Sequence, residues 1–161
     1  MKALYVRLDS RLVHGQVCTA WTPQLGINRI VIVHDLFGGD PFMAKVYRMA
    51  VPAGVQCDAL KSDAALEEWQ KNQFGDGNVL VLFPDVKTAK KLYDAGFHFD
   101  HLQVGTLPGG RNKVTISKQV NVSAENVEDF KYLLDQGIHV FCQMVPSDSR
   151  VPIGNLLSKF K

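Results

Sequence analysis

The sequence predicts an α/β fold: a single domain with an open, mainly parallel β-sheet of about six or seven strands and helices on both faces. Short strand-like segments alternate with helix-like segments along the chain, which is typical of parallel sheets. Near-continuous apolar runs such as VLVLF (79–83) suit strands that are covered on both faces. No internal repeat or long linker divides the 161 residues, so we expect one domain over 1–161.

The expected strands are short and rich in Val, Ile, Leu and Phe, the residue types that favour extended backbone. They are expected over 3–8, 29–34, 55–60, 78–83, 101–105 and 139–145, and a further extended piece is expected within 113–122.

The clearest helix is expected over 124–137. Val127, Phe130 and Leu134 recur at the spacing of one helix face, Ser123 precedes them as an N-cap, and Gly137 follows as a terminating residue. Similar or weaker patterns predict helices over 15–21, 41–50, 62–72, 85–96 and 152–160.

Composition excludes several function classes. The net charge is only +2 and no Lys/Arg block is present, which argues against a nucleic-acid partner. The amino terminus does not resemble a secretory signal, and the longest apolar run is far shorter than the roughly 20 residues of a membrane span. The three cysteines are widely spaced, so we expect reduced, mostly buried thiols and a cytoplasmic protein.

The segment DSRLVHGQ (9–16) follows the first expected strand, at the edge of the sheet where parallel α/β proteins bind their ligands. It contains a single glycine, so neither the dinucleotide fingerprint nor the P-loop motif is present. No HxxxH, CxxC or grouped carboxylates with metal-ligand spacing occur, and neither a metal nor a cofactor is expected.

His14 is the candidate catalytic residue, because a neutral imidazole can attack a phosphoryl group. Arg11, and next Arg7, are the candidates to neutralise the phosphate oxygens. Asp9 is expected to orient the imidazole ring or only to cap the turn. Gly15 leaves room for a partner to approach.

Other polar residues carry weaker expectations. His34, at the end of the second expected strand, has a modest claim to the same site, whereas the remaining histidines are expected to be structural or solvated. Leu12 and Val13 either form an exposed apolar ring around the site or pack inward. Arg111 and Lys113 lie in the loop VGTLPGGRNK (104–113) and are expected to be solvated.

The whole string RLDSRLVHGQV (7–17) resembles the phosphorylation-site motif of the EIIB components of the mannose/fructose/sorbose-type sugar phosphotransferase system. Trp21, VIVHD (31–35), DAGF (94–97) with LQVG (102–105), and VFCQMVP (140–146) extend the likeness over nearly the full chain. The loop after 101–105 departs from the family pattern, which bears on the choice of partner or sugar.

This resemblance implies a phosphocarrier. A phosphorylated EIIA protein donates a phosphoryl group to His14, and the membrane permease EIIC/EIID presents the sugar that receives it. Family usage suggests Nδ1 as the acceptor atom. Backbone N–H groups at Gly15 and Gln16, where a helix begins, are expected to cradle the phosphate. The protein is then cytoplasmic and peripherally associated with the permease, with no segment inserted in the membrane.

Two other readings remain open. A histidine phosphatase or mutase also places His-Gly after its first strand, but its arginine directly precedes the histidine, where this chain has Val13. A non-catalytic receiver-type module would carry paired acidic residues after the first strand, and none follow it here. The sugar and the oligomeric state are not readable from the sequence.

Overall fold

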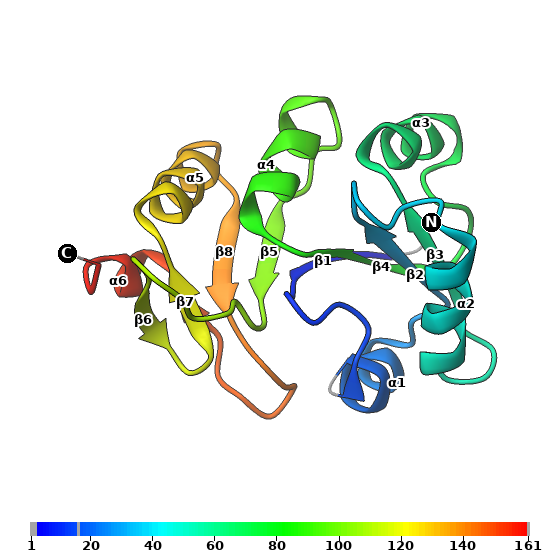
Figure 1. The fold of residues 1–161 in the computed structure, drawn as a ribbon, viewed down its shortest axis with the longest axis horizontal. Helices are drawn as coiled ribbons and strands as arrows, with labels where there is room; N and C mark the ends of the chain where they lie inside the picture. Colours follow the sequence, from blue (N-terminus) through cyan, green and yellow to red (C-terminus); the bar gives the residue numbers. More distant parts are fainter. Residues whose placement is uncertain (1–2, 16, 161) are drawn as a thin grey trace.

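The protein folds around a seven-stranded sheet (Figure 1). The computed structural model describes residues 3–15 and 17–160. The strand order is β3-β2-β4-β1-β5-β8-β9, and all neighbours run parallel except β9, which is antiparallel to β8. The strands are β1 (Ala3–Leu8), β2 (Arg29–Val33), β3 (Gln56–Leu60), β4 (Asn78–Phe83), β5 (His101–Val104), β8 (His139–Cys142) and β9 (Val151–Pro152). The predicted fold class is confirmed.

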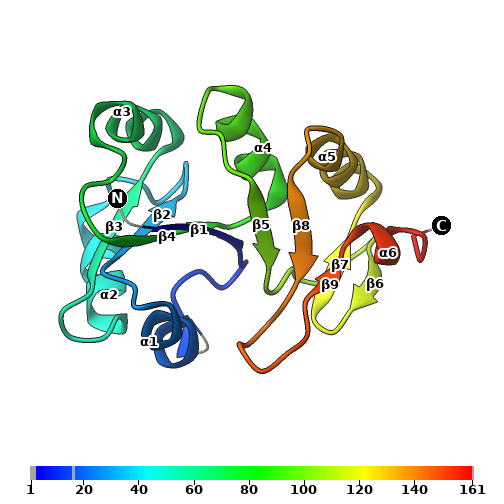
Figure 2. The same cartoon turned by 180° about the vertical axis from the view of Figure 1, so that it is seen from behind.

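Helices cover both faces of this sheet. Figures 1 and 2 show α3, α4 and α5 along one face and α1 and α2 along the other. The segments are η1 (Val17–Trp21), α1 (Thr22–Leu25), α2 (Pro41–Ala50), α3 (Ser62–Asn72), α4 (Val86–Asp94), α5 (Ala124–Asp135) and α6 (Gly154–Leu157). A hairpin of β6 (Val114–Ser117) and β7 (Val120–Val122) forms a second, two-stranded sheet. Within the described ranges, every helix is too short or too polar to cross a bilayer.

The apolar run in β4 shows why the sheet needs two layers of helices. Val79, Val81 and Phe83 pack into one buried cluster, whereas Leu80 and Leu82 pack into a second. Successive side chains of a strand point to opposite faces, so a strand that is apolar at every position is stable only with both faces covered. This arrangement leaves the central strands β4 and β1 buried and directs their carboxyl ends to one edge.

Side chains cap the starts of two helices, and the cap predicted at Ser123 is one of them. Before α5, Ser123 Oγ accepts a hydrogen bond from the Asn126 N–H (3.1 Å), and Asn126 Oδ1 accepts one from the Ser123 N–H (3.0 Å). Before α4, Asp85 Oδ1 accepts from the Thr88 N–H at 2.8 Å. After α5, Gly137 adopts a φ of +87°, a left-handed conformation that ends the helix.

Three local expectations need correction. The segment 15–21 was expected as an ordinary helix, but Val17–Trp21 is π-helical and continues into the single turn α1. The strand expected over 139–145 ends at Cys142, because the Gln143 and Met144 carbonyls turn to hydrogen-bond donors outside the ladder. The two-residue strand β9 was not predicted, and the helix expected over 152–160 is confined to Gly154–Leu157. The cysteines are buried and unpaired, as predicted.

Candidate active site

The loop that carries His14 begins in the middle of the sheet. β1 lies between β4 and β5, and it ends at Leu8. The loop first continues the pairing: the Asp9 N–H donates to the Phe83 carbonyl (3.0 Å) at the end of β4, and the Ser10 N–H donates to the Thr106 carbonyl (2.9 Å) beyond β5. The predicted position at the carboxyl edge of the sheet is therefore confirmed.

Asp9 is the centre of the hydrogen-bond network and has no solvent exposure. Its Oδ2 accepts from Arg7 Nε (3.2 Å) and lies 2.9 Å from His14 Nε2. Its Oδ1 accepts from Thr106 Oγ1 (2.7 Å) and from the Arg11 N–H (3.1 Å). Burial alone raises the pKa of this carboxyl. The hydrogen bonds from His14 and Thr106 and the charge of Arg7 outweigh burial, so the pKa lies below its usual value and Asp9 is ionised.

This ionised carboxylate fixes the tautomer of His14. A carboxylate only accepts hydrogen bonds, so Nε2 of His14 is the protonated nitrogen that donates to Asp9. Nδ1 of the neutral ring then carries the lone pair. Nδ1 is buried and has no hydrogen-bond partner among the described residues, and the side chain as a whole is 8% exposed. The ring therefore lies mostly inside the protein, with its nucleophilic nitrogen unpaired.

Arg7 lies behind Asp9 and does not face the loop surface. Its side chain is 1% exposed, and the guanidinium sits 5.5 Å from the Trp21 ring centroid. Nη1 donates to the Gln103 amide oxygen and to the Gln143 carbonyl (3.0 Å), while Nη2 donates to the Met144 carbonyl (3.0 Å). Burial lowers the pKa of Arg7, and the neighbouring carboxylate offsets part of this effect. Since all three guanidinium nitrogens are engaged, this geometry favours a positioning role over contact with a phosphate.

Arg11 and Gly15 lie at the surface of the same loop. The Arg11 guanidinium makes no hydrogen bond or ion pair with any residue in the described part of the chain. A Cβ placed on Gly15 would meet no described atom within 4 Å, so the approach at this point is open. Gln16, predicted with Gly15 to cradle a phosphate, lies outside the described residues.

Leu12 bends the loop. It adopts a φ of +57°, which is strained for a branched side chain, and is only 6% exposed. Its N–H donates to the Asp9 carbonyl (3.0 Å), which closes the turn. Leu12 and Val13 both pack against the cluster that contains Tyr47 of α2. Of the two alternatives for Leu12 and Val13, the structure favours inward packing.

Two residues of the site were missed by sequence reasoning. Thr106 holds Asp9, as described above. Gly105 leaves space for the arginine, since a Cβ there would lie 2.2 Å from Arg7 Nη2 and 2.7 Å from Asp9 Oδ2. The available signal was a glycine directly after a buried strand at the same sheet edge.

Other candidate residues lie apart from this network. Nδ1 of His34 accepts hydrogen bonds from the Leu36 and Phe37 N–H groups (3.2 Å each), and its ring stacks on Phe37. Lys113 Nζ donates to the Pro108 carbonyl within its own loop. No three His, Cys, Asp or Glu side chains in residues 3–15 and 17–160 gather closely enough to hold a metal ion.

Comparison with known proteins gives consistent matches over nearly the whole chain. Residues 3–161 match the family described as the PTS system sorbose subfamily IIB component. The mannose-specific EIIAB component of Escherichia coli (strain K12) is 26% identical over 95% of this chain. The alignment spans only 47% of that relative, about half of its length.

Two solved structures resemble the fold closely. The crystal structure of manxB from Thermoanaerobacter tengcongensis superposes with a TM-score of 0.89 at 31% identity, covering 99% of this chain and 98% of that one. The IIBSor domain of the sorbose permease from Klebsiella pneumoniae gives a TM-score of 0.91 at 25% identity, covering 100% and 99%.

The fold and these likenesses define the class of the protein: it is an EIIB component of the sugar phosphotransferase system. Within that class, the chain belongs to the sorbose subfamily. The resemblance inferred from RLDSRLVHGQV is thereby confirmed.

Proposed function

We propose that residues 1–161 form one EIIB domain in which His14 carries the phosphoryl group. A phosphorylated EIIA protein is the donor, and a sugar presented by the EIIC/EIID permease is the final acceptor. The protein works on the cytoplasmic side and associates with the permease peripherally. The observation that carries this proposal is the orientation of His14, with Nε2–H directed at Asp9 and Nδ1 unpaired.

The Nδ1 lone pair attacks the phosphorus atom of the EIIA phosphohistidine, and the P–N bond on EIIA breaks as the new P–N bond forms. In the second step a sugar hydroxyl attacks the same phosphorus atom. The Nδ1–P bond breaks, its electron pair returns to Nδ1, and the hydroxyl proton is released. Asp9 stabilises the positive charge that the ring carries while Nδ1 is bonded to phosphorus, because its carboxylate accepts the Nε2 hydrogen bond throughout.

Roles for the two arginines follow from their positions. Arg11 is exposed, so its guanidinium is available to the phosphoryl oxygens as they transfer. Arg7 acts through Asp9: it holds the carboxylate that holds the ring, and we assign it a positioning role. Gly15 keeps the surface open beside His14.

The ring must move for transfer, because Nδ1 has almost no contact with solvent. Rotation of the His14 side chain, or a shift of the loop, exposes Nδ1 when a partner docks. The strained backbone at Leu12, two residues earlier, lowers the cost of such a shift, since part of the strain is released when the loop changes conformation.

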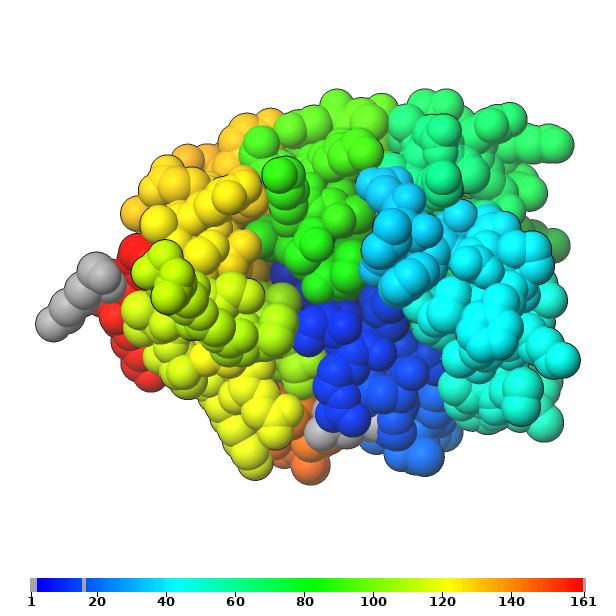
Figure 3. Space-filling model, viewed as in Figure 1, coloured from blue at the N-terminus to red at the C-terminus, as the bar shows by residue number. Residues whose placement is uncertain are grey.

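The surface near this loop fits repeated, transient docking. Leu36, Phe42 and Met49 are 74%, 72% and 77% exposed. Large apolar residues exposed in this way are typical of interaction sites when they lie together. Figure 3 shows the segment of α2 beside the loop after β1 on one face of the molecule. Met43, on the inner side of α2, packs against the same cluster as Leu12. We therefore expect a partner that docks at His14 to contact α2 as well.

The test is phosphoryl transfer from purified, phosphorylated EIIA. We expect His14→Ala to accept no phosphate and to keep its fold, whereas the matched His34→Ala variant accepts normally. The product should be acid-labile and alkali-stable, and NMR of ¹⁵N-labelled histidine should show phosphorylation at Nδ1. Full acceptance by His14→Ala would refute the assignment. Modification at Nε2 would refute the proposed role of Asp9.

A further inference from the structure

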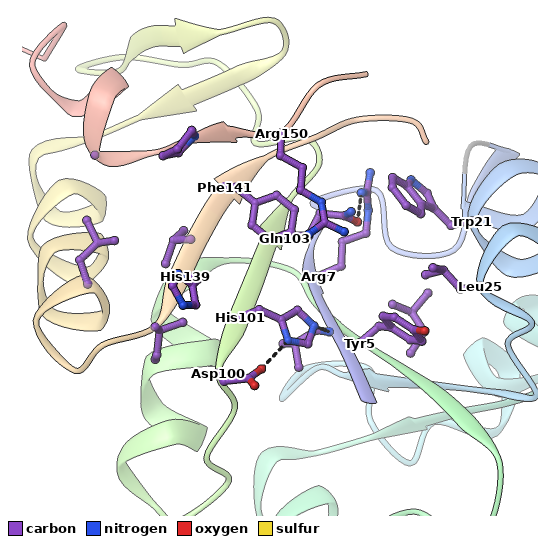
Figure 4. A pocket seen from close by; sticks show the side chains of 17 residues that line it. Tyr5, Arg7, Trp21, Leu25, Asp100, His101, Gln103, His139, Phe141 and Arg150 are labelled. Atoms are coloured by element: carbon purple, nitrogen blue, oxygen red, sulfur yellow. Dashed lines mark hydrogen bonds and ion pairs between the residues drawn. The ribbon is translucent and has the colours of Figure 1, made fainter. Parts of the chain in front are cut away.

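A large cleft lies on the sheet face that α1 and α2 cover only in part (Figure 4). It has a volume of about 690 Å³, within the roughly 300–1,000 Å³ of typical small-molecule sites. α1 borders it on one side and β9 on the other. β1, β5 and β8 form its base. None of the functions assigned to His14 uses this cleft.

Strand register explains which side chains line the cleft. His101 pairs with His139, and Gln103 pairs with both Arg7 and Phe141 across neighbouring strands. Side chains at alternate positions of paired strands share a face, so these residues form two adjacent rows on the open side. The cleft is thus a built feature of the sheet, because its polar and aromatic groups are aligned by the ladder itself.

The base of the cleft holds two buried polar side chains, and three aromatic rings stand around it. Arg7 and Gln103 at the base are 1% and 9% exposed, and both are held in the hydrogen-bond network behind Asp9. Figure 4 shows Tyr5, Trp21 and Phe141 around the space above them. Aromatic faces of this kind bind the C–H surface of a ring-shaped ligand and order it at little entropic cost.

The rim of the cleft carries a cation at its β9 end. The Arg150 guanidinium lies 4.8 Å from the centroid of the Phe141 ring and makes no ion pair with a carboxylate in the described part of the chain. His139 is exposed too, but it lies near Asp100 and away from Arg150 (Figure 4). Asp100 lies at the other end of the cleft, where its carbonyl accepts a hydrogen bond from the His139 N–H (3.0 Å) and its carboxylate is engaged by His101 Nδ1 at 2.7 Å (Figure 4). A forked guanidinium above an aromatic wall matches an anionic group attached to a ring.

We propose that this cleft is a second ligand site, which binds a phosphorylated hexose through its ring and its phosphate together. The phosphate pairs with Arg150, and the sugar ring lies against Phe141 and Tyr5. The choice of a sugar phosphate rests on the proposed function, because such a molecule is the product of that transfer. The site itself rests only on the geometry of the cleft.

A ligand bound in the cleft contacts residues that also belong to the hydrogen-bond network of the active site. Trp21 Nε1 donates to the Met144 carbonyl at 2.8 Å, and Arg7 Nη2 donates to the same oxygen at 3.0 Å. Arg7 in turn holds Asp9, which holds His14. A ligand in the cleft therefore contacts the residues that position the phosphoacceptor without contacting the phosphoacceptor itself.

Two tryptophans allow a direct test by NMR. Trp21 lines the cleft, whereas Trp69 packs against Phe74 and Phe97 on the opposite side of the sheet. We expect mannose 6-phosphate to shift the Trp21 indole N–H signal saturably and to leave the Trp69 signal in place. Free mannose and inorganic phosphate, each lacking one half of the recognition, should bind at least about tenfold more weakly. No saturable shift, an equal shift of both signals, or phosphate alone binding as tightly would overturn the proposal.

Variants then locate the site. Arg150→Ala should weaken binding by about tenfold to a hundredfold, while Lys71→Ala, the same charge change on an exposed residue of α3, should leave it unchanged. His14→Ala should bind mannose 6-phosphate normally, so the outcome does not depend on whether His14 accepts phosphate. Loss of binding in His14→Ala, or unchanged binding in Arg150→Ala, would place the ligand elsewhere and reject the cleft.

Discussion

Arg7 and Arg11 stand two residues on either side of Asp9 in the sequence, and the fold uses them in opposite ways. Arg7 is the last inward-facing polar residue of β1, is 1% exposed and has its guanidinium fully engaged. Arg11 is already in the loop, exposed, and touches Asp9 only through its backbone N–H. The strand boundary at Leu8 separates them. A buried cation can order a site, whereas only an exposed one can follow a group that moves between proteins.

The largest effect is expected from Arg7→Met. The substitution keeps most of the side-chain volume but leaves the Asp9 carboxylate buried without its countercharge. Removing one partner of a buried ion pair typically destabilises a protein by about 3–5 kcal/mol. Urea unfolding should show a loss of this size. If Arg7→Met were as stable as the wild type, the assignment of a structural role to Arg7 and a phosphate-binding role to Arg11 would be wrong.

A smaller loss is expected when the space for Arg7 is filled. In Gly105→Ala the new Cβ would lie 2.2 Å from Arg7 Nη2, so the guanidinium or the loop must shift. Overpacking of this kind costs about 1–3 kcal/mol. Gly109→Ala is the matched control in the same loop, because its nearest neighbour is 3.8 Å away. Thermal unfolding of the two variants should separate them, and equal midpoints would count against the role of Gly105.

Acid should destabilise the protein, because it removes the charge of Asp9, the buried carboxylate that Arg7 holds. The folded pKa of Asp9 is lowered, since hydrogen bonds and the Arg7 charge outweigh burial. Its stabilising contribution is therefore complete above the unfolded pKa of about 3.9 and is lost as pH falls through the lower folded pKa. Each unit of this difference is worth about 1.4 kcal/mol. Between about pH 5 and pH 2, wild-type stability should fall more steeply than that of Asp9→Asn, and parallel urea midpoints would contradict this.

The sequence analysis correctly predicted those parts of the structure that depend on residues close together in the chain. The run VLVLF predicts a strand covered on both faces because alternate residues must meet different layers, and both clusters exist. The position of His14 at the sheet edge follows from its place directly after the first strand. Capping by Ser123 and Asp85 also depends only on neighbouring residues.

The parts that were missed depend on contacts between distant residues. Arg7 meets a carbonyl 136 residues away, and Thr106 reaches Asp9 across 97 residues. A single sequence does not show which distant segments lie side by side. Arg7 was therefore predicted to be a phosphate ligand, because only its nearness to Arg11 could be seen. The early end of β8 has the same origin, since the Gln143 and Met144 carbonyls turn to Arg7, which is distant in the sequence.

The smallest effect on stability, and the sharpest functional one, is expected from Arg11→Met. Because its guanidinium is exposed, its removal should change the free energy of unfolding by no more than about 0.5 kcal/mol. The rate of phosphoryl transfer from EIIA to His14 should nevertheless fall by about tenfold or more, because one charge-assisted donor to the phosphoryl oxygens is lost. Arg11→Lys keeps the charge but not the fork, and should recover part of the rate. Rapid-quench measurements on the two variants test this role of Arg11. An unchanged rate in Arg11→Met would show that neither arginine contacts the transferring group. The exposed half of the loop would then lose its assigned role.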